Sequence, residues 1–224
     1  GTITIMQTFG TRVADDAGKQ VTLNSPATVE FLTWIDDCYT VRKLFPPGVV
    51  TWDGSGDNNS YQSGQAIFIP NPGSVYRWMN QNDKELLAAT RFGALPAGPK
   101  LRITPMGLAL RGIFASSKQR DAAFKLTEHL TSPTVMSQWF KIDNNGPVLA
   151  GQKTMDAFKD PFLGALVEVA ETGAPGAFPD IANPAWSEFN SQFIVPKMIQ
   201  RVVVDRWKPE QAVEEAHKVT TEIY

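Results

Sequence analysis

The 224-residue sequence has few of the side chains from which metal and nucleophilic sites are usually built. It contains a single cysteine, Cys38, so an internal disulfide is excluded. Cys38 falls in an apolar helical run, where a cysteine is usually a small buried hydrophobe. The only two histidines, His129 and His217, are far apart and lack the spacing of metal ligands. We therefore predict no metal site, no cofactor and no cysteine nucleophile.

Strong charge and long hydrophobic runs are missing as well. Lysine and arginine number 21 against 23 aspartates and glutamates, a net charge of −2 that gives no field to attract nucleic acid. No apolar run approaches the roughly 20 residues of a membrane-spanning helix. A phosphate-binding P-loop is absent, and the Gly54-Ser55-Gly56 turn follows no predicted strand. The chain starts without methionine or a signal-like segment, which indicates a processed, truncated or excised piece.

Adjacent carboxylates occur at Asp36-Asp37 and at Asp15-Asp16. Neighbouring side chains on a helix point about 100° apart, so Asp36 and Asp37 cannot both face one bond. A sugar-acting hydrolase would need two carboxylates that face each other across a cleft. The sequence marks no such pair, and this enzyme class remains an alternative.

The sequence does contain a pattern of short apolar runs separated by helices, which predicts an α/β fold. The central stretch is residues 58–78, where the apolar run 66–69 is closed by Pro70-Asn71-Pro72-Gly73. This predicts a buried strand that ends in a loop. Because ligands in open α/β sheets bind beyond the carboxyl ends of strands, we expect a small molecule to bind at this loop.

The remaining elements follow from periodicity, prolines and caps. Further strands are expected at residues 2–6, 20–23, 92–96, 101–103 and 107–115. Helices are expected at residues 26–45, 83–90, 118–130, 133–142, 154–158, 161–172, 186–207 and from 209 onward, with a kink or break at Pro196. Ser25 before Pro26 and Asp160 before Pro161 are expected to cap their helices.

The order of several motifs resembles that of a known family. These are DAGKQVTLNSP at residues 16–26, YQSGQAI at 61–67, the helix pair at 118–133 and PEQAVEEA at 209–216. They resemble, in order, segments of the extracellular solute-binding proteins of family 1. These are the maltose-binding-protein-like, substrate-binding components of ABC importers for sugars and related compounds.

The resemblance implies a periplasmic-binding-protein-like fold of type II, with ligand held between two lobes. It implies that residues 1–108 and 150–224 form the C-terminal lobe and that 109–149 belong to the other lobe. The family's N-terminal segment is missing here, so the apolar faces of 109–149 would need cover from a missing N-terminal lobe or a second chain. Hinges are expected at Gly107 and at Asn145-Gly146-Pro147.

The implied function is capture of a carbohydrate or polyol in an interlobe cleft, without chemistry, for delivery to an ABC permease in the membrane. The protein would then be no enzyme, and would be periplasmic or extracellular as part of a secreted or lipid-anchored parent whose signal peptide is not in this chain. Two alternatives stay open. One is the sugar-acting hydrolase, and the other is an assembled fragment of a solute-binding protein that no longer binds.

A sugar offers hydroxyl pairs to planar polar side chains and a C–H face to aromatic rings. Trp186 is the expected stacking residue. For Asn71 the alternative to ligand contact is a turn-forming role. Arg111 is expected either in the cleft or in an interlobe ion pair, with an exposed position at the strand edge as the alternative. The complete set of expected ligand contacts is Asn71, Gly73, Ser74, Tyr76, Trp78, Arg111, Asp180, Asn183 and Trp186.

Overall fold

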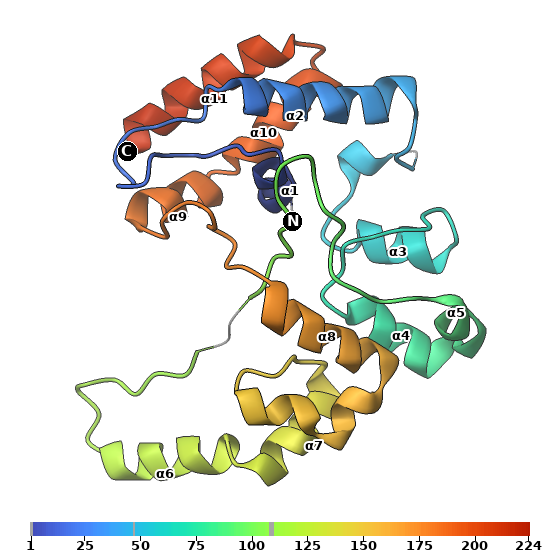
Figure 1. Ribbon diagram of the computed structural model, residues 1–224, viewed down its shortest axis with the longest axis vertical. Coiled ribbons are helices and arrows are strands. Elements are labelled where there is room, and N and C mark those ends of the chain that lie inside the picture. The colour runs from blue at the N-terminus through green and yellow to red at the C-terminus, as the bar shows by residue number, and fades with distance from the viewer. Residues whose placement is uncertain (1, 47, 108–109) are drawn as a thin grey trace. The chain divides into compact units, whose positions relative to one another are not determined.

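The computed structural model describes residues 2–46, 48–107 and 110–224. Regular structure within those residues is helical, apart from isolated bridges that join Ala14 to Val21 and Pro105 to Ala174 (Figure 1). The α-helices are α1 (Thr2–Thr8), α2 (Pro26–Asp36), α3 (Gly56–Gln62), α4 (Ser74–Asn82), α5 (Lys84–Ala89), α6 (Arg120–Leu130), α7 (Pro133–Asp143), α8 (Pro161–Thr172), α9 (Pro184–Ser191), α10 (Ile194–Val203) and α11 (Pro209–Ile223). Shorter turns are the π-helical η1 (Asp37–Val41) and the 3-10 helices η2 (Val49–Thr51), η3 (Ala150–Thr154) and η4 (Asp156–Lys159).

The chain forms two compact units, which are described separately. Unit 1 consists of Gly1–Val75, Leu95–Pro105 and Ala174–Tyr224, and unit 2 of Tyr76–Ala94 and Met106–Gly173. These boundaries differ from those of the expected lobe segments 1–108, 109–149 and 150–224. The assignment of segments to lobes stays a prediction, and the residues at its first boundary, 108 and 109, lie outside the described residues.

The core of unit 1 is built by α2, α10 and α11, which pack on one another (Figure 1). Its fully buried side chains include Phe31, Met198 and Val213, one from each helix. In α10 the buried positions Ile194, Val195, Met198 and Val202 recur at helical spacing, so one face of the helix enters the core. Cys38 is buried as predicted, and its burial raises the pKa of the thiol.

Unit 2 has a smaller core around α7 and α8. Phe140 is fully buried there, and Phe162 stacks on Tyr76 with ring centroids 4.4 Å apart. Phe92 meets both of those rings edge-on. The start of α8 confirms its predicted cap, because the Asp160 carboxylate accepts hydrogen bonds from Phe162 N at 2.9 Å and Leu163 N at 3.0 Å.

The strand expected at residues 2–6 is wrong, since this segment is α1. Met6 and Gln7 are fully buried, and the Gln7 side chain donates a hydrogen bond to the Ala177 carbonyl at 2.9 Å. Packing of Met6 into the unit 1 core therefore outweighs the β preference of the threonines and isoleucines around it.

The central strand expected at residues 66–69 is also wrong. Ile67 is 97% exposed, Phe68 is exposed, and no described segment pairs with them. An apolar run does not show by itself whether a neighbouring strand exists to hydrogen-bond with it. The polar segment before this run forms α3, and the loop after the run leads into α4.

Other expected strands are wrong for the same reason. Residues 92–96 and 101–103 form no strand, and 20–23 make a single bridge at Val21. Leu108 and Ala109 of the expected strand 107–115 lie outside the described residues, and the described remainder is not a strand. The helix expected at 186–207 does divide, but at Phe193 with φ 55°, which leaves Pro196 inside the first turn of α10.

Candidate functional site

The loop that precedes α4 is organised by the side-chain amide of Asn71. Its Nδ2 donates to Asn58 Oδ1 at 2.6 Å, and its Oδ1 accepts from Gly73 N at 2.9 Å and Val75 N at 3.2 Å. Ser74 Oγ adds a bond to Asn71 Oδ1 at 3.1 Å. Gly73 has φ 106°, which a side chain would strain. These bonds give Asn71 its turn-forming role, and contact of Asn71, Gly73 or Ser74 with a ligand stays a prediction.

Tyr76 and Trp78 follow on α4, in unit 2. The Tyr76 hydroxyl donates to Asp160 Oδ2 at 2.8 Å, and its ring belongs to the aromatic cluster with Phe162. Burial, together with the hydrogen bond and charge of Asp160, raises the pKa of Tyr76 to about 12. Trp78 is half-buried. The surroundings of Tyr76 are those of a packing residue.

Arg111 is exposed, which agrees with the alternative of an exposed edge position. Its guanidinium carbon lies 4.2 Å from the ring centroid of Trp139, also in unit 2. This is a cation–π contact, which is worth about 0.5–1 kcal/mol at an exposed position. A ligand contact by Arg111 stays a prediction.

Asp180 is a buried hydrogen-bond acceptor in unit 1, with a side chain only 1% exposed. Its Oδ1 accepts from Val13 N at 3.0 Å, Ala14 N at 3.1 Å and Arg12 Nε at 3.2 Å. Hydrogen bonds from this many donors offset the free-energy cost of removing the carboxylate from water. It therefore holds the segment after α1 in place.

Asn183 caps α9, because its Oδ1 accepts from Trp186 N at 2.7 Å. Its Nδ2 donates to the Gly18 carbonyl at 3.2 Å. Trp186 is half-buried, and its covered Nε1 has no hydrogen-bond partner among the described residues. The role of Trp186 as a stacking residue stays a prediction.

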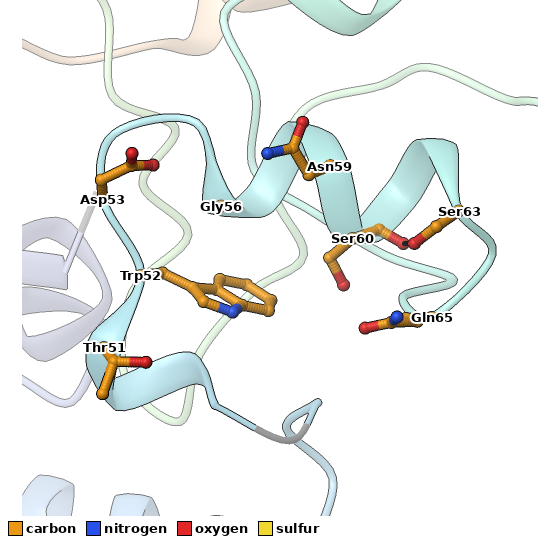
Figure 2. Close-up of a pocket in the computed structure, with 8 residues that line it drawn as sticks. All are labelled: Thr51, Trp52, Asp53, Gly56, Asn59, Ser60, Ser63 and Gln65. Atoms are coloured by element: carbon orange, nitrogen blue, oxygen red, sulfur yellow. Dashed lines mark hydrogen bonds between the residues drawn. The ribbon is translucent and has the colours of Figure 1, made fainter.

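Sequence reasoning missed a pocket of about 300 Å³ in unit 1 (Figure 2). Every lining residue comes from one short stretch that combines the end of η2, a loop, α3 and the residues just after α3. The lining is Thr51, Trp52, Asp53, Gly56, Asn59, Ser60, Ser63 and Gln65. Figure 2 shows the indole of Trp52 projecting from the loop toward α3, with Ser60 and Gln65 beyond its far edge.

The wall of this pocket is one face of α3. Gly56, Asn59, Ser60 and Ser63 are spaced i, i+3, i+4 and i+7, the spacing that places residues on the same side of a helix. In a helix that packs on a core those positions are usually apolar. A face of small and polar residues on a helix that follows Trp52 is therefore the sequence signal from which this pocket could have been predicted.

Trp52 is held against the start of α3 because residue 56 is glycine. A Cβ atom at Gly56 would lie 2.4 Å from both Cβ and Cγ of Trp52. Asp53 is fixed on the loop, where its Oδ1 accepts from Ser55 N at 2.9 Å and Ser55 Oγ at 2.7 Å. These two bonds hold the pKa of Asp53 below its usual value, so it is ionised at neutral pH.

Polar groups that line the pocket remain without protein partners. Ser60 is 3% exposed, and its Oγ has no hydrogen-bond partner among the described residues. The side-chain amides of Asn59 and Gln65 are exposed and likewise bond to none of the residues that the structure describes. Across those residues there is also no cluster of three metal-ligating side chains, and no helix has the length and apolarity to cross a membrane.

Comparison with known sequences gives the family. The sequence profile of the bacterial extracellular solute-binding proteins matches residues 3–163, well over half of the chain. The chain belongs to this family. No curated protein sequence matches it significantly.

Solved structures similar to this family member are sugar-binding proteins. Maltose-bound MalE3 of T. maritima has a TM-score of 0.80 and 23% identity. The match covers 100% of this chain and 56% of the MalE3 chain. The maltose-maltodextrin binding protein of Alicyclobacillus acidocaldarius has a TM-score of 0.72, 18% identity and coverages of 98% and 58%. A solute-binding protein of Thermotoga lettingae, bound with α-D-tagatose, has a TM-score of 0.71, 21% identity and coverages of 100% and 55%.

These likenesses confirm the predicted type II periplasmic-binding-protein fold for the family member described here. The described residues nevertheless contain little strand and are mostly helical. The chain spans a little over half the length of the structures it matches.

Proposed function

We propose that this protein is the sugar-binding component of an ABC importer and acts in the periplasm or outside the cell. Membership of the extracellular solute-binding family carries the proposal. The ligand class is supported by two of the similar structures, one solved with maltose bound and the other with α-D-tagatose. Neither of the two alternatives, a sugar-acting hydrolase and a non-binding fragment, has a specific observation in its favour.

In this proposal a carbohydrate or polyol is captured between two lobes without any bond being made or broken. The ligand favours the closed arrangement because it contacts both lobes only there, and a membrane permease then recognises that arrangement. The loop at residues 71–74 and the segment 180–186 are the proposed contact regions, with Trp186 as the aromatic partner of the sugar.

The part of the binding protein beyond this chain belongs to the proposal as well. The similar structures are longer, since the chain covers 55–58% of them. We propose that an N-terminal lobe or a second chain supplies the other side of the cleft. The affinity of this chain alone would then be lower than that of the whole protein, because fewer contacts form.

A thermal-shift titration with maltose, maltotriose, D-tagatose and glycerol tests the proposal. Ligand at about 100 times its dissociation constant stabilises a protein by about 2.7 kcal/mol. For a chain of this length the melting temperature should rise by roughly 5–10 °C. Chromatography of the recovered sugar should show it unchanged.

Two results would count against the proposal. Cleavage of maltotriose in proportion to protein concentration would favour the hydrolase. A melting temperature that no saccharide or polyol changes would show that this chain does not bind the proposed ligand class.

A further inference from the structure

We propose that the pocket formed by residues 51–65 is a carbohydrate-binding site, in which Trp52 stacks on one sugar ring and side chains from α3 bond its hydroxyls. The inference rests on the proposed function, because it takes the ligand to be a saccharide. It adds a site that contains none of the nine contacts expected from the sequence.

The first support is the fixed indole. A sugar ring presents a face of C–H groups, and a flat aromatic surface binds such a face without directional bonds. Trp52 is half-buried, lines the pocket and is held against α3 by its close approach to Gly56. An aromatic ring that is already held in place loses little conformational entropy on binding.

The second support is the set of polar groups without protein partners. A buried hydroxyl without a hydrogen bond is unfavourable, and a ligand that supplies the missing partner removes that penalty. Ser60 Oγ is such a group, and the Asn59 and Gln65 amides offer paired donors and acceptors nearby. Ser60 Oγ is covered, so a ligand hydroxyl reaches it only after a side-chain adjustment at the pocket wall.

Size and charge narrow the ligand class. A volume of about 300 Å³ lies at the lower end of small-molecule sites, which suits one sugar unit. The single charged side chain of the lining is Asp53, which disfavours anionic ligands such as sugar phosphates. The remaining polar side chains are neutral hydroxyls and amides, which suit the neutral hydroxyls of a saccharide.

The pocket shares α3 with the loop at residues 71–74. Asn58 bonds that loop through Asn71, while the next two residues, Asn59 and Ser60, line the pocket. A sugar in the pocket would therefore contact the same helix that holds the expected binding loop.

Calorimetric titration of maltose into the chain and its variants tests the site. We expect Trp52→Ala to weaken binding at least tenfold and Ser60→Ala to weaken it about fivefold. Ser60→Ala should leave the melting temperature without ligand unchanged or higher, because it removes an unpaired buried hydroxyl. A merely structural role for Ser60 would not combine these two results.

The matched control is Trp207→Ala. Trp207 is another partly exposed tryptophan of unit 1, and it stacks on Arg201 with 4.7 Å between the guanidinium carbon and the ring centroid. It takes no part in the pocket lining. Its substitution should change maltose affinity less than twofold. If Trp52→Ala fails to fold by circular dichroism, Asn59→Ala and Gln65→Ala provide the test, since both side chains are exposed, with a threefold weakening expected for each.

The outcomes separate the two proposals. If the chain binds maltose and all pocket variants keep its affinity, the pocket assignment is overturned and the proposed function remains. If tetramethylammonium binds in place of maltose, with loss in Trp52→Ala, the pocket is a cation site and the carbohydrate assignment is overturned. If neither probe binds the chain, both proposals fail for it.

Discussion

Units 1 and 2 use the same kind of amphipathic helix with different results. In unit 1, α10 buries five side chains because α2 and α11 pack against it. In unit 2, α6 buries none of its residues, although α7 packs against it. Large exposed apolar side chains of unit 2 are Leu110, Phe114, Phe124, Leu126, Ile142, Val148 and Leu149. Periodicity therefore shows which face of a helix favours burial, whereas the neighbouring elements together decide how much of that face they cover.

This difference bears on the expectation that residues 109–149 need cover from elsewhere. Several of their large apolar side chains, such as Phe114, Phe124 and Leu126, are exposed, whereas Met136 and Phe140 are buried. An exposed apolar area of this kind commonly marks an interaction surface. That an N-terminal lobe or a second chain covers it stays a prediction.

The largest effect is expected from Phe31→Ala. Phe31 is fully buried in α2 and meets Phe9 edge-on, with ring centroids 5.6 Å apart. The cavity should lower the free energy of unfolding by about 3–5 kcal/mol. Urea unfolding measures it, with Phe31→Leu as the milder control. A loss below about 1 kcal/mol would show that unit 1 does not depend on this core.

The second prediction concerns Asp180→Ala, which leaves the amides of Val13 and Ala14 without their acceptor. We expect a loss of about 2–3 kcal/mol and faster hydrogen exchange at those two amides. The matched control is Asp16→Asn, which removes an ion pair from the same Arg12 at a side chain that is 97% exposed. That change should cost less than about 1 kcal/mol. Equal effects of the two substitutions would contradict the role of Asp180 in holding the segment after α1.

The third prediction uses pH to compare the units, because each contains a tyrosine whose pKa is raised to about 12. They are Tyr76 in unit 2 and Tyr224 in unit 1, and burial is the main cause for both. A raised pKa means that folding favours the neutral phenol. The stabilisation is therefore complete below pH 10, the usual tyrosine value, and is lost as pH rises through about 12.

Tyr76→Phe should cost about 1 kcal/mol at neutral pH through the lost bond to Asp160. It should also reduce the loss of stability between pH 10 and 12. Ultraviolet titration of the folded protein should lose one late-ionising tyrosine, whereas Tyr224→Phe should remove the other. Ionisation of Tyr76 near pH 10 would contradict its described surroundings.

The smallest effect is expected from Phe124→Ala on α6, where Phe124 is 57% exposed. The free energy of unfolding of this chain should fall by less than about 1 kcal/mol, because little apolar area returns to water. The same substitution in a longer form that contains the proposed covering lobe should cost more than it does here. Equal, small effects in both forms would argue against cover at α6.

The local signals that succeeded were those with a short-range physical cause. Ser25 caps α2, where its Oγ accepts from Thr28 N at 3.3 Å, and Pro26 occupies the first turn as predicted. Such caps depend on a few adjacent residues, so the sequence alone contains what is needed. The order of the motifs also sufficed for the family, which the match over residues 3–163 confirms.

The sequence by itself determined the starts of α2, α7, α8 and α11, the family and the scarcity of metal-ligating and nucleophilic side chains. The tertiary structure decided whether Met6 and Ile67 are buried, because burial depends on segments far away in the chain. It also decided that Asn71 and Asp180 bond to backbone amides, and that Trp52 lies against the polar face of α3. The physical reason is the same in each case: hydrogen bonds and packing are set by distances in space, which local propensity does not contain.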